Sequence, residues 1–167
     1  MLEKTVVKEE LSKGTDLSII NLVNGLVEDA HQLGASDIHI EPEEEEVRVR
    51  FRIDGVLQDA YTLPKTIHYE VISRIKVLSG LRTDEHQAAQ DGRFRATRGG
   101  ETALDIRVSI APTYYGENAV LRLLAERAEQ FSLDTLGFSE SDRKKIAKAI
   151  RKPYGMILST GPTGSGK

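Results

Sequence analysis

The sequence contains no cysteine among its 167 residues, so it can form neither a disulfide framework nor a thiolate zinc site. It also lacks long apolar runs, and no stretch approaches the about 20 apolar residues that a membrane-spanning helix requires. The first residues, Met1 to Lys4, do not show the charged and then apolar layout of a signal peptide. These absences predict a soluble, cytoplasmic protein with no segment inserted into a membrane.

Aromatic residues are scarce, at 5%, and the formal net charge at pH 7 is -3. Nucleic-acid binders usually carry a basic surface, and those that bind single strands add aromatic side chains on which bases stack. The arginine-rich stretch at 48–52 is the feature that favours such a role. The charge and the few aromatics oppose it, and we expect no nucleic-acid partner.

The first half of the chain alternates between helical and strand patterns. Apolar residues recur at helical spacing from Asp16, an expected N-cap, to Gly34, an expected helix stop. "SDIHIEP" then predicts a short strand, and the four glutamates at 43–46 predict a solvated hairpin tip. In "VRVRFRIDGVLQDAY" strict alternation predicts a half-buried strand, with the arginines on one face and Asp54-Gly55 as a tight turn.

The second half continues this pattern. A helix is predicted over 63–78, with Pro64 in its first turn and Gly80 past its end. "RFRAT" and "TALDIRVSIAP" predict a hairpin, and "GENAVLRLL" a further strand. Ser139 is the expected N-cap of a short helix ending near Arg151, and residues 155–160 read as a short apolar strand. The order of elements predicts an α+β domain with an antiparallel sheet up to about Leu124, a linker, and the opening of an α/β domain.

The last seven residues match the phosphate-binding pattern G-x-x-x-x-G-K. Its glycines let successive backbone N–H groups turn toward phosphate oxygens, and its lysine reaches the outer phosphates. The alternative is a flexible Gly/Ser-rich tail. The strand expected before the motif favours a loop that binds ATP, with Mg²⁺ as its companion. The candidate residues are Gly161, Pro162, Thr163, Gly164, Ser165, Gly166 and Lys167.

Two arginines stand out from the others. Arg107 and Arg122 lie within otherwise apolar strands, "LDIRVSI" and "AVLRLL", where an arginine needs a partner or a task. A planar, permanently charged guanidinium suits a γ-phosphate. For most of the remaining arginines we expect a solvated face, balanced by carboxylates such as Asp54, Asp59 or Asp105.

Seven ordered blocks carry a resemblance to a known family: "GASDIHIEP", "VRVRFRIDGVL", "QDGRF", "DIRVS", "GENAVLRLL", "LGF" and "KPYGMILSTGPTGSGK". Over residues 17–167 the chain resembles the secretion-type assembly ATPases, the hexameric motors of type II secretion and of type IV pilus extension. "LRTDEHQAAQDGRF" looks closer to the pilus-assembly branch, and the long N-terminal block favours extension over retraction.

The resemblance implies a domain plan. Residues 1–16 would be a flexible segment and 17–125 a PAS-like N-terminal domain with an antiparallel sheet and flanking helices. Residues 126–137 would link it to the start of a RecA-like ATPase domain at 138–167, which breaks off at the phosphate-binding loop.

The resemblance also implies a mechanism and partners. ATP would lie on the loop ending at Lys167, between the two domains, and Arg107 and Arg122 would close over its γ-phosphate. A homohexamer at the cytoplasmic face of the inner membrane would act on an inner-membrane platform protein. Because the magnesium-binding hydroxyl and later acidic residues are absent from the sequence, we expect the 167-residue chain alone to be inactive. Because the resemblance implies that part of the ring interface is also missing, we expect this chain alone to be largely monomeric or to pack only weakly.

Two features leave alternatives open. Many family members carry arginine where this chain has Asn118, which puts a ring contact there in doubt. A strand would place Asp37, His39 and Glu41 on one face, as a metal site or as an ordinary polar face, and we favour the polar face. A competing hypothesis for the N-terminal domain is a non-catalytic module for ring packing or docking.

Overall fold

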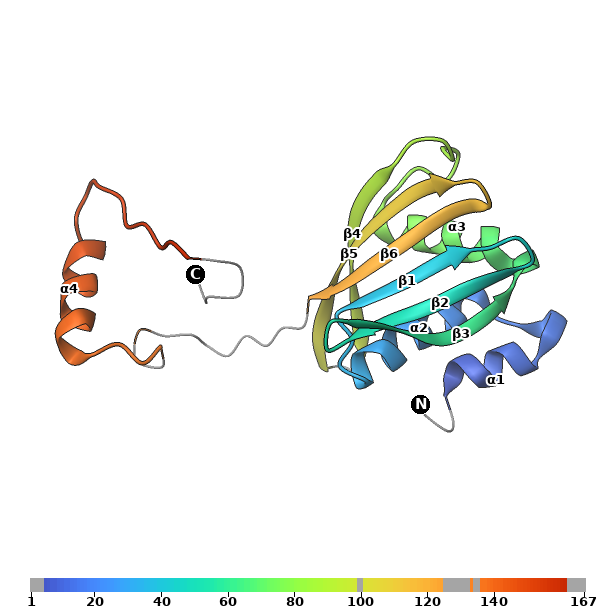
Figure 1. Ribbon diagram of the computed structural model, residues 1–167, viewed down its shortest axis with the longest axis horizontal. Coiled ribbons are helices and arrows are strands. Elements are labelled where there is room, and N and C mark those ends of the chain that lie inside the picture. Colours follow the sequence, from blue (N-terminus) through green and yellow to red (C-terminus); the bar gives the residue numbers. More distant parts are fainter. Residues whose placement is uncertain (1–4, 99–100, 125–132, 134–135, 162–167) are drawn as a thin grey trace. The chain divides into compact units, whose positions relative to one another are not determined.

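The computed structural model describes residues 5–98, 101–124, 133 and 136–161. The chain divides into two compact units, residues 1–126 and 127–167. The first unit is an α+β domain built on one antiparallel sheet of six strands, in the order β3-β2-β1-β6-β5-β4 (Figure 1). Its strands are β1 (Asp37–Pro42), β2 (Glu46–Ile53), β3 (Val56–Pro64), β4 (Gln90–Arg98), β5 (Glu101–Thr113) and β6 (Gly116–Leu124). Its helices are α1 (Val6–Ser12), α2 (Ile19–Gln32) and α3 (His68–Ser79), with 3-10 turns at Gly14–Asp16 and Lys65–Ile67.

The alternation in β2 sets the two faces of the sheet. Val47, Val49 and Phe51 are buried at 0–1% exposure, while the arginines between them point to the opposite face. The turn to β3 has positive φ at both central residues, 50° at Asp54 and 80° at Gly55. This is the backbone twist that a two-residue hairpin requires, so the predicted turn is confirmed.

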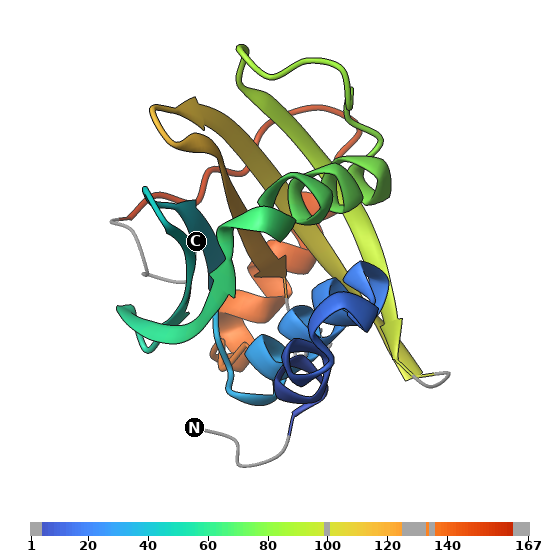
Figure 2. The same cartoon turned by 90° about the vertical axis from the view of Figure 1, so that its right-hand side faces the viewer.

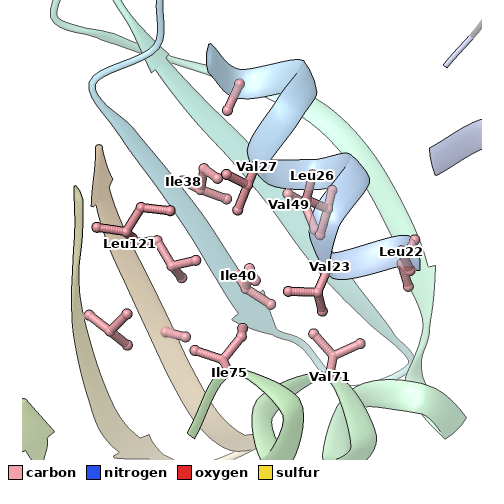
Figure 3. Packing of buried hydrophobic residues seen from close by; sticks show 14 of the residues in the cluster. Leu22, Val23, Leu26, Val27, Ile38, Ile40, Val49, Val71, Ile75 and Leu121 are labelled. Atoms are coloured by element: carbon pink, nitrogen blue, oxygen red, sulfur yellow. The ribbon is translucent and has the colours of Figure 1, made fainter. Parts of the chain in front are cut away.

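The hydrophobic core lies between one face of the sheet and the helices (Figures 2 and 3). Helix α2 contributes Leu22, Val23 and Leu26, and α3 contributes Val71 and Ile75. They pack against the inward side chains of the strands, which are each at most 1% exposed at Ile38, Ile40, Val49 and Leu121. This packing leaves the other face of the sheet to polar side chains.

The N-terminal residues form a helix that the sequence analysis did not predict. Residues 1–16 were expected to be a flexible segment, whereas α1 begins after Thr5, whose Oγ1 accepts from the Lys8 N–H at 3.2 Å. Val7 is fully buried against α2, where the absent side chain of Gly25 leaves room for it. A helix of seven residues is too short to show a clear apolar period, so only its packing reveals it.

Two helices begin later in the sequence than predicted. Ser18, not Asp16, caps α2, and its Oγ accepts from the Asn21 N–H at 3.3 Å. Helix α3 begins at His68, not at Leu63, because Leu63 belongs to β3, where it pairs with Val47. The C-terminal end of α3 is as predicted, with Gly80 in the left-handed conformation at φ 67°.

The second unit contains α4 (Glu140–Ile150). Ser139 caps it as predicted, accepting from the Asp142 N–H at 3.1 Å. The predicted strand at 155–160 is wrong: these residues have no strand structure, and Ile157 and Leu158 are 61% and 75% exposed. A strand needs a neighbour for its backbone hydrogen bonds, and the described part of this unit provides none. Across the described residues, no helix has both the length and the apolarity needed to span a membrane.

Candidate functional site

A row of charged residues crosses the polar face of the sheet at one register level. Directly paired positions on five neighbouring strands, from β4 to β2, form it. We call it the arginine row; it consists of Arg93, Arg107, Arg122, Asp37 and Arg52. With four arginines and one aspartate, its formal charge is 4 − 1 = +3.

Asp37 is the buried member of the row. Its side chain is 7% exposed, and its two oxygens face arginines on the strands to either side. Oδ1 lies 2.9 Å from Nε of Arg122, and Oδ2 lies 3.2 Å from Nε of Arg52. Burial would raise the pKa of Asp37, but hydrogen bonds from Arg122 and Ser36, and the charges of Arg122 and Arg52, hold that pKa below its ordinary value of 3.8.

Arg122 is held at one atom only. Its Nε donates to Asp37, while its side chain as a whole is 66% exposed. Within the described residues, no hydrogen bond involves its two terminal nitrogens. Among the residues that the structure describes, the guanidinium is therefore anchored at Nε, with no partner at its two terminal nitrogens.

Arg107 and Arg93 continue the row toward the edge strand. Both are exposed, and neither has a hydrogen bond or ion pair with any residue that the structure describes. Arg107 lies directly between Arg93 and Arg122, a like-charge arrangement that destabilises a sheet. An anion bound along these three residues would offset the repulsion, and guanidinium groups bind phosphate oxygens through paired N–H donors.

The structure thus brings Arg107 and Arg122, the two predicted site residues, to adjacent positions. Sequence reasoning missed that Arg93 and Arg52 belong to the same row, and it assigned them to an ordinary solvated face. It had also noted Asp37, but not as a partner of arginine. Alternation identified the face of each residue, whereas only the strand register shows that they share one level.

The remaining sheet arginines are paired as surface residues. Arg50 binds Glu41 through two hydrogen bonds of 2.7 Å, and Arg48 lies 3.0 Å from Glu43. Asp59 is the cross-strand neighbour of Arg50, and its charge acts on Arg50, but the guanidinium makes its hydrogen bonds to Glu41.

Of the other carboxylates that were expected to balance arginines, one does so in the structure and one lies elsewhere. Asp105 pairs with Arg95 at 2.8 Å, as expected. Asp54, the third expected partner, lies in the β2–β3 turn, outside these pairs. His39 and Glu41 share the polar face with Asp37, as predicted, but Asp37 and Glu41 are occupied by arginines. Burial, the largest effect, lowers the pKa of His39, which favours its neutral form.

The structure describes only the first residue of the candidate phosphate-binding loop. Gly161 is the last described residue, and residues 162–167 lie outside the described part of the chain. The predicted roles of these seven residues therefore stay predictions.

The fold recurs in two proteins of known structure. A structure of the pilus retraction motor PilT with bound ADP covers 86% of this chain and 39% of its own, with a TM-score of 0.54 at 22% identity. The Legionella pneumophila ATPase DotB covers 86% of this chain and 38% of its own, with a TM-score of 0.56 at 21% identity. At these identities the likeness concerns the fold alone.

The sequence defines the family. A model of the type II/IV secretion system protein family matches residues 12–167, and the chain belongs to this family. It is 42% identical over 166 residues to the type IV pilus assembly ATPase PilB of Myxococcus xanthus. It is 45% identical over 152 residues to the type II secretion system protein E of Dickeya dadantii. These alignments cover 99% and 91% of this chain but 29% and 30% of the relatives, so the chain spans less than a third of their length.

Proposed function

We propose that this chain is part of a cytoplasmic, hexameric ATPase that couples ATP hydrolysis to type IV pilus assembly or type II protein secretion. The family membership supports this proposal, together with the similarity to a type IV pilus assembly ATPase and to a type II secretion system protein E. In it, the first unit is the PAS-like N-terminal domain, and the second unit opens a RecA-like domain that works at the inner membrane with a platform protein.

Within this machine, Arg107 and Arg122 bind the γ-phosphate of an ATP whose phosphates lie on the loop Gly161–Lys167. The observation that carries this assignment is their adjacent placement in the arginine row. Among the described residues, no hydrogen bond uses the terminal nitrogens of Arg122 or the donors of Arg107, and no carboxylate neutralises Arg107. Phosphoryl transfer is catalysed mainly by positioning and by stabilising charge on the transferred group, which is the task these two residues would perform.

The chemistry follows from the side chains. Arginine stays protonated at all physiological pH values and offers planar pairs of donors that match phosphate oxygens. Two such groups on adjacent strands can contact different oxygens of one γ-phosphate and stabilise the charge that builds up as its bond to ADP breaks. Mg²⁺ enters this proposal as a companion of ATP.

The test uses the full-length protein that contains this chain. ATP turnover and ATP affinity are measured for the wild type, Arg107→Ala and Arg122→Ala. Each substitution is expected to lower kcat by a factor on the order of 10³ with little loss of affinity, because the contact forms mainly in the transition state.

Arg95→Ala is the matched control. Arg95 is an exposed arginine on the same face of β4, but it lies one level outside the arginine row and pairs with Asp105. This variant is expected to keep its kcat. Near-normal turnover in both Arg107→Ala and Arg122→Ala would overturn the assignment and leave the first unit as a docking and ring-packing module.

A further inference from the structure

We propose that Asp37 is a positioning residue that holds the Arg122 guanidinium at Nε and so directs its two terminal nitrogens toward the γ-phosphate. This inference rests on the function proposed for Arg122 and adds a residue to it. Asp37 itself would touch neither nucleotide nor phosphate, because its carboxylate is buried beneath the arginines.

The first argument is the way in which the pair is joined. An arginine that binds a carboxylate through Nε and one terminal nitrogen uses a whole edge of its guanidinium. Arg50 and Glu41 do this, with Nε and Nη2 each 2.7 Å from a Glu41 oxygen. Arg122 instead donates to Asp37 through Nε alone, at 2.9 Å. The edge formed by its two terminal nitrogens stays available for a second, bidentate partner.

The second argument is that Asp37 cannot easily move. Its side chain is 7% exposed, and Oδ2 also accepts from Ser36 Oγ at 2.8 Å. The backbone of Ser36 is tied on both sides, since its N–H donates to the Arg52 carbonyl at 2.8 Å and its carbonyl accepts from the Leu123 N–H at 2.9 Å. Asp37 is therefore a fixed point next to which the long, exposed side chain of Arg122 takes one orientation.

Arg52 supports the same arrangement from the other side. Its Nε lies 3.2 Å from Oδ2 of Asp37, and its Nη1 donates to the Gly55 carbonyl at 3.1 Å. Arg52 is thus bound to the β2–β3 turn and keeps Oδ2 engaged, which leaves Oδ1 to Arg122. The Asp37 carboxylate lies between Arg52 and Arg122 and so also reduces the repulsion between these two cations.

The experiment is a double-mutant cycle on ATP turnover in the full-length protein. It compares the wild type with Asp37→Asn, Arg122→Ala and the double variant. Asp37→Asn keeps the size of the side chain but removes its charge. It is expected to lower kcat by a factor on the order of 10 to 100 with KM little changed, as for a misplaced catalytic group. It should have no further effect when Arg122 is already alanine, because Asp37 would act only through that residue.

Glu41→Gln is the matched control. It removes a carboxylate from the same face of the same strand and breaks an ion pair that is as close, but Arg50 lies outside the arginine row. Its kcat is expected to stay near the wild-type value. An equal loss of kcat in Glu41→Gln and Asp37→Asn would overturn the proposal, because the effect would then reflect the general charge of the face.

The other outcomes separate this inference from the proposed function. If Arg122→Ala keeps its turnover, the function proposed for Arg122 fails and this inference fails with it. If Arg122→Ala loses turnover but Asp37→Asn does not, or if the two losses multiply in the double variant, only the role of Asp37 is overturned.

A second variant decides the question if Asp37→Asn does not fold. Arg122→Lys leaves Asp37 with a cation to pair with, but the three donors of an ammonium group share one nitrogen. It therefore cannot be held at one nitrogen and present a planar pair of donors from two others. The expected kcat is close to that of Arg122→Ala. A kcat near the wild-type value would show that a positive charge is sufficient and would overturn the proposal.

Discussion

The ammonium nitrogen of Lys76 lies 2.6 Å from Oε1 of Glu117, and the two side chains are only 1% and 9% exposed. Lys76 comes from α3 and Glu117 from β6, so the ion pair joins a helix to the sheet. His86 extends the cluster, with Nδ1 2.8 Å from Oε2 of Glu117. Burial would raise the pKa of Glu117, but Lys76 and His86 hold it below its ordinary value. The cluster also fixes the segment 81–89, which leads into β4 and the arginine row.

Replacing Lys76 by methionine is expected to destabilise the first unit strongly. The substitution keeps the length of the side chain but leaves the Glu117 carboxylate buried without its cation. The expected loss in the free energy of unfolding is about 3–5 kcal/mol, measured by urea denaturation of the 167-residue chain. Arg82→Met breaks an ion pair whose members are 71% and 72% exposed, and its cost in the free energy of unfolding should be far smaller than that of Lys76→Met, because solvent screens the pair. Equal costs for the two variants would contradict this account of the buried pair.

The stability of the first unit is expected to fall in mild acid because of His68. Burial, the largest effect, lowers the pKa of His68 below its ordinary value of 6.5, and its Nε2 lies 2.9 Å from the Glu117 carbonyl. A carbonyl only accepts, so Nε2 carries the hydrogen in the neutral ring. As the pH falls below 6.5, the unfolded chain takes up a proton that the native state does not, and stability decreases until the native pKa is passed.

Urea denaturation at a series of pH values measures this decrease. His68→Gln removes the titrating ring but keeps an N–H donor for the Glu117 carbonyl. Its stability should therefore fall less steeply than that of the wild type below pH 6.5. Since burial also lowers the pKa of His39, part of the slope is expected to persist in the variant. Identical slopes in the two proteins would show that His68 does not contribute.

Gly92 is expected to be sensitive to the addition of a single methyl group. A Cβ at this position would lie 2.8 Å from the Ser79 carbonyl oxygen and 2.9 Å from Cδ2 of Leu81. Gly92→Ala should push β4 away from the end of α3 and cost about 1–3 kcal/mol in the free energy of unfolding. Asp91→Ala, at an exposed neighbouring position of the same strand, should change stability by less than about 0.5 kcal/mol. Thermal and urea denaturation of both variants would test this, and similar stabilities would argue against close packing at Gly92.

Much of the fold could be read from local patterns. The alternation at 47–53 predicted which face of β2 is buried, and Asp54-Gly55 predicted the turn that follows. The patterns failed where contacts across the chain decide the structure. Helix α1 is held by its packing on α2, and Leu63 is buried by its strand partner, not by a helix.

The candidate site, like the fold, was predicted from local sequence in part and decided by tertiary contacts in the rest. The sequence by itself singled out Arg107 and Arg122, because each interrupts a stretch of otherwise mostly apolar residues. Only the tertiary structure decided their neighbours. Strand β1 is inserted between β2 and β6, which places Asp37 directly beside Arg122, 85 residues away in sequence. Strand order and register arise from how the whole sheet packs against α2 and α3, and no short stretch of sequence contains that information.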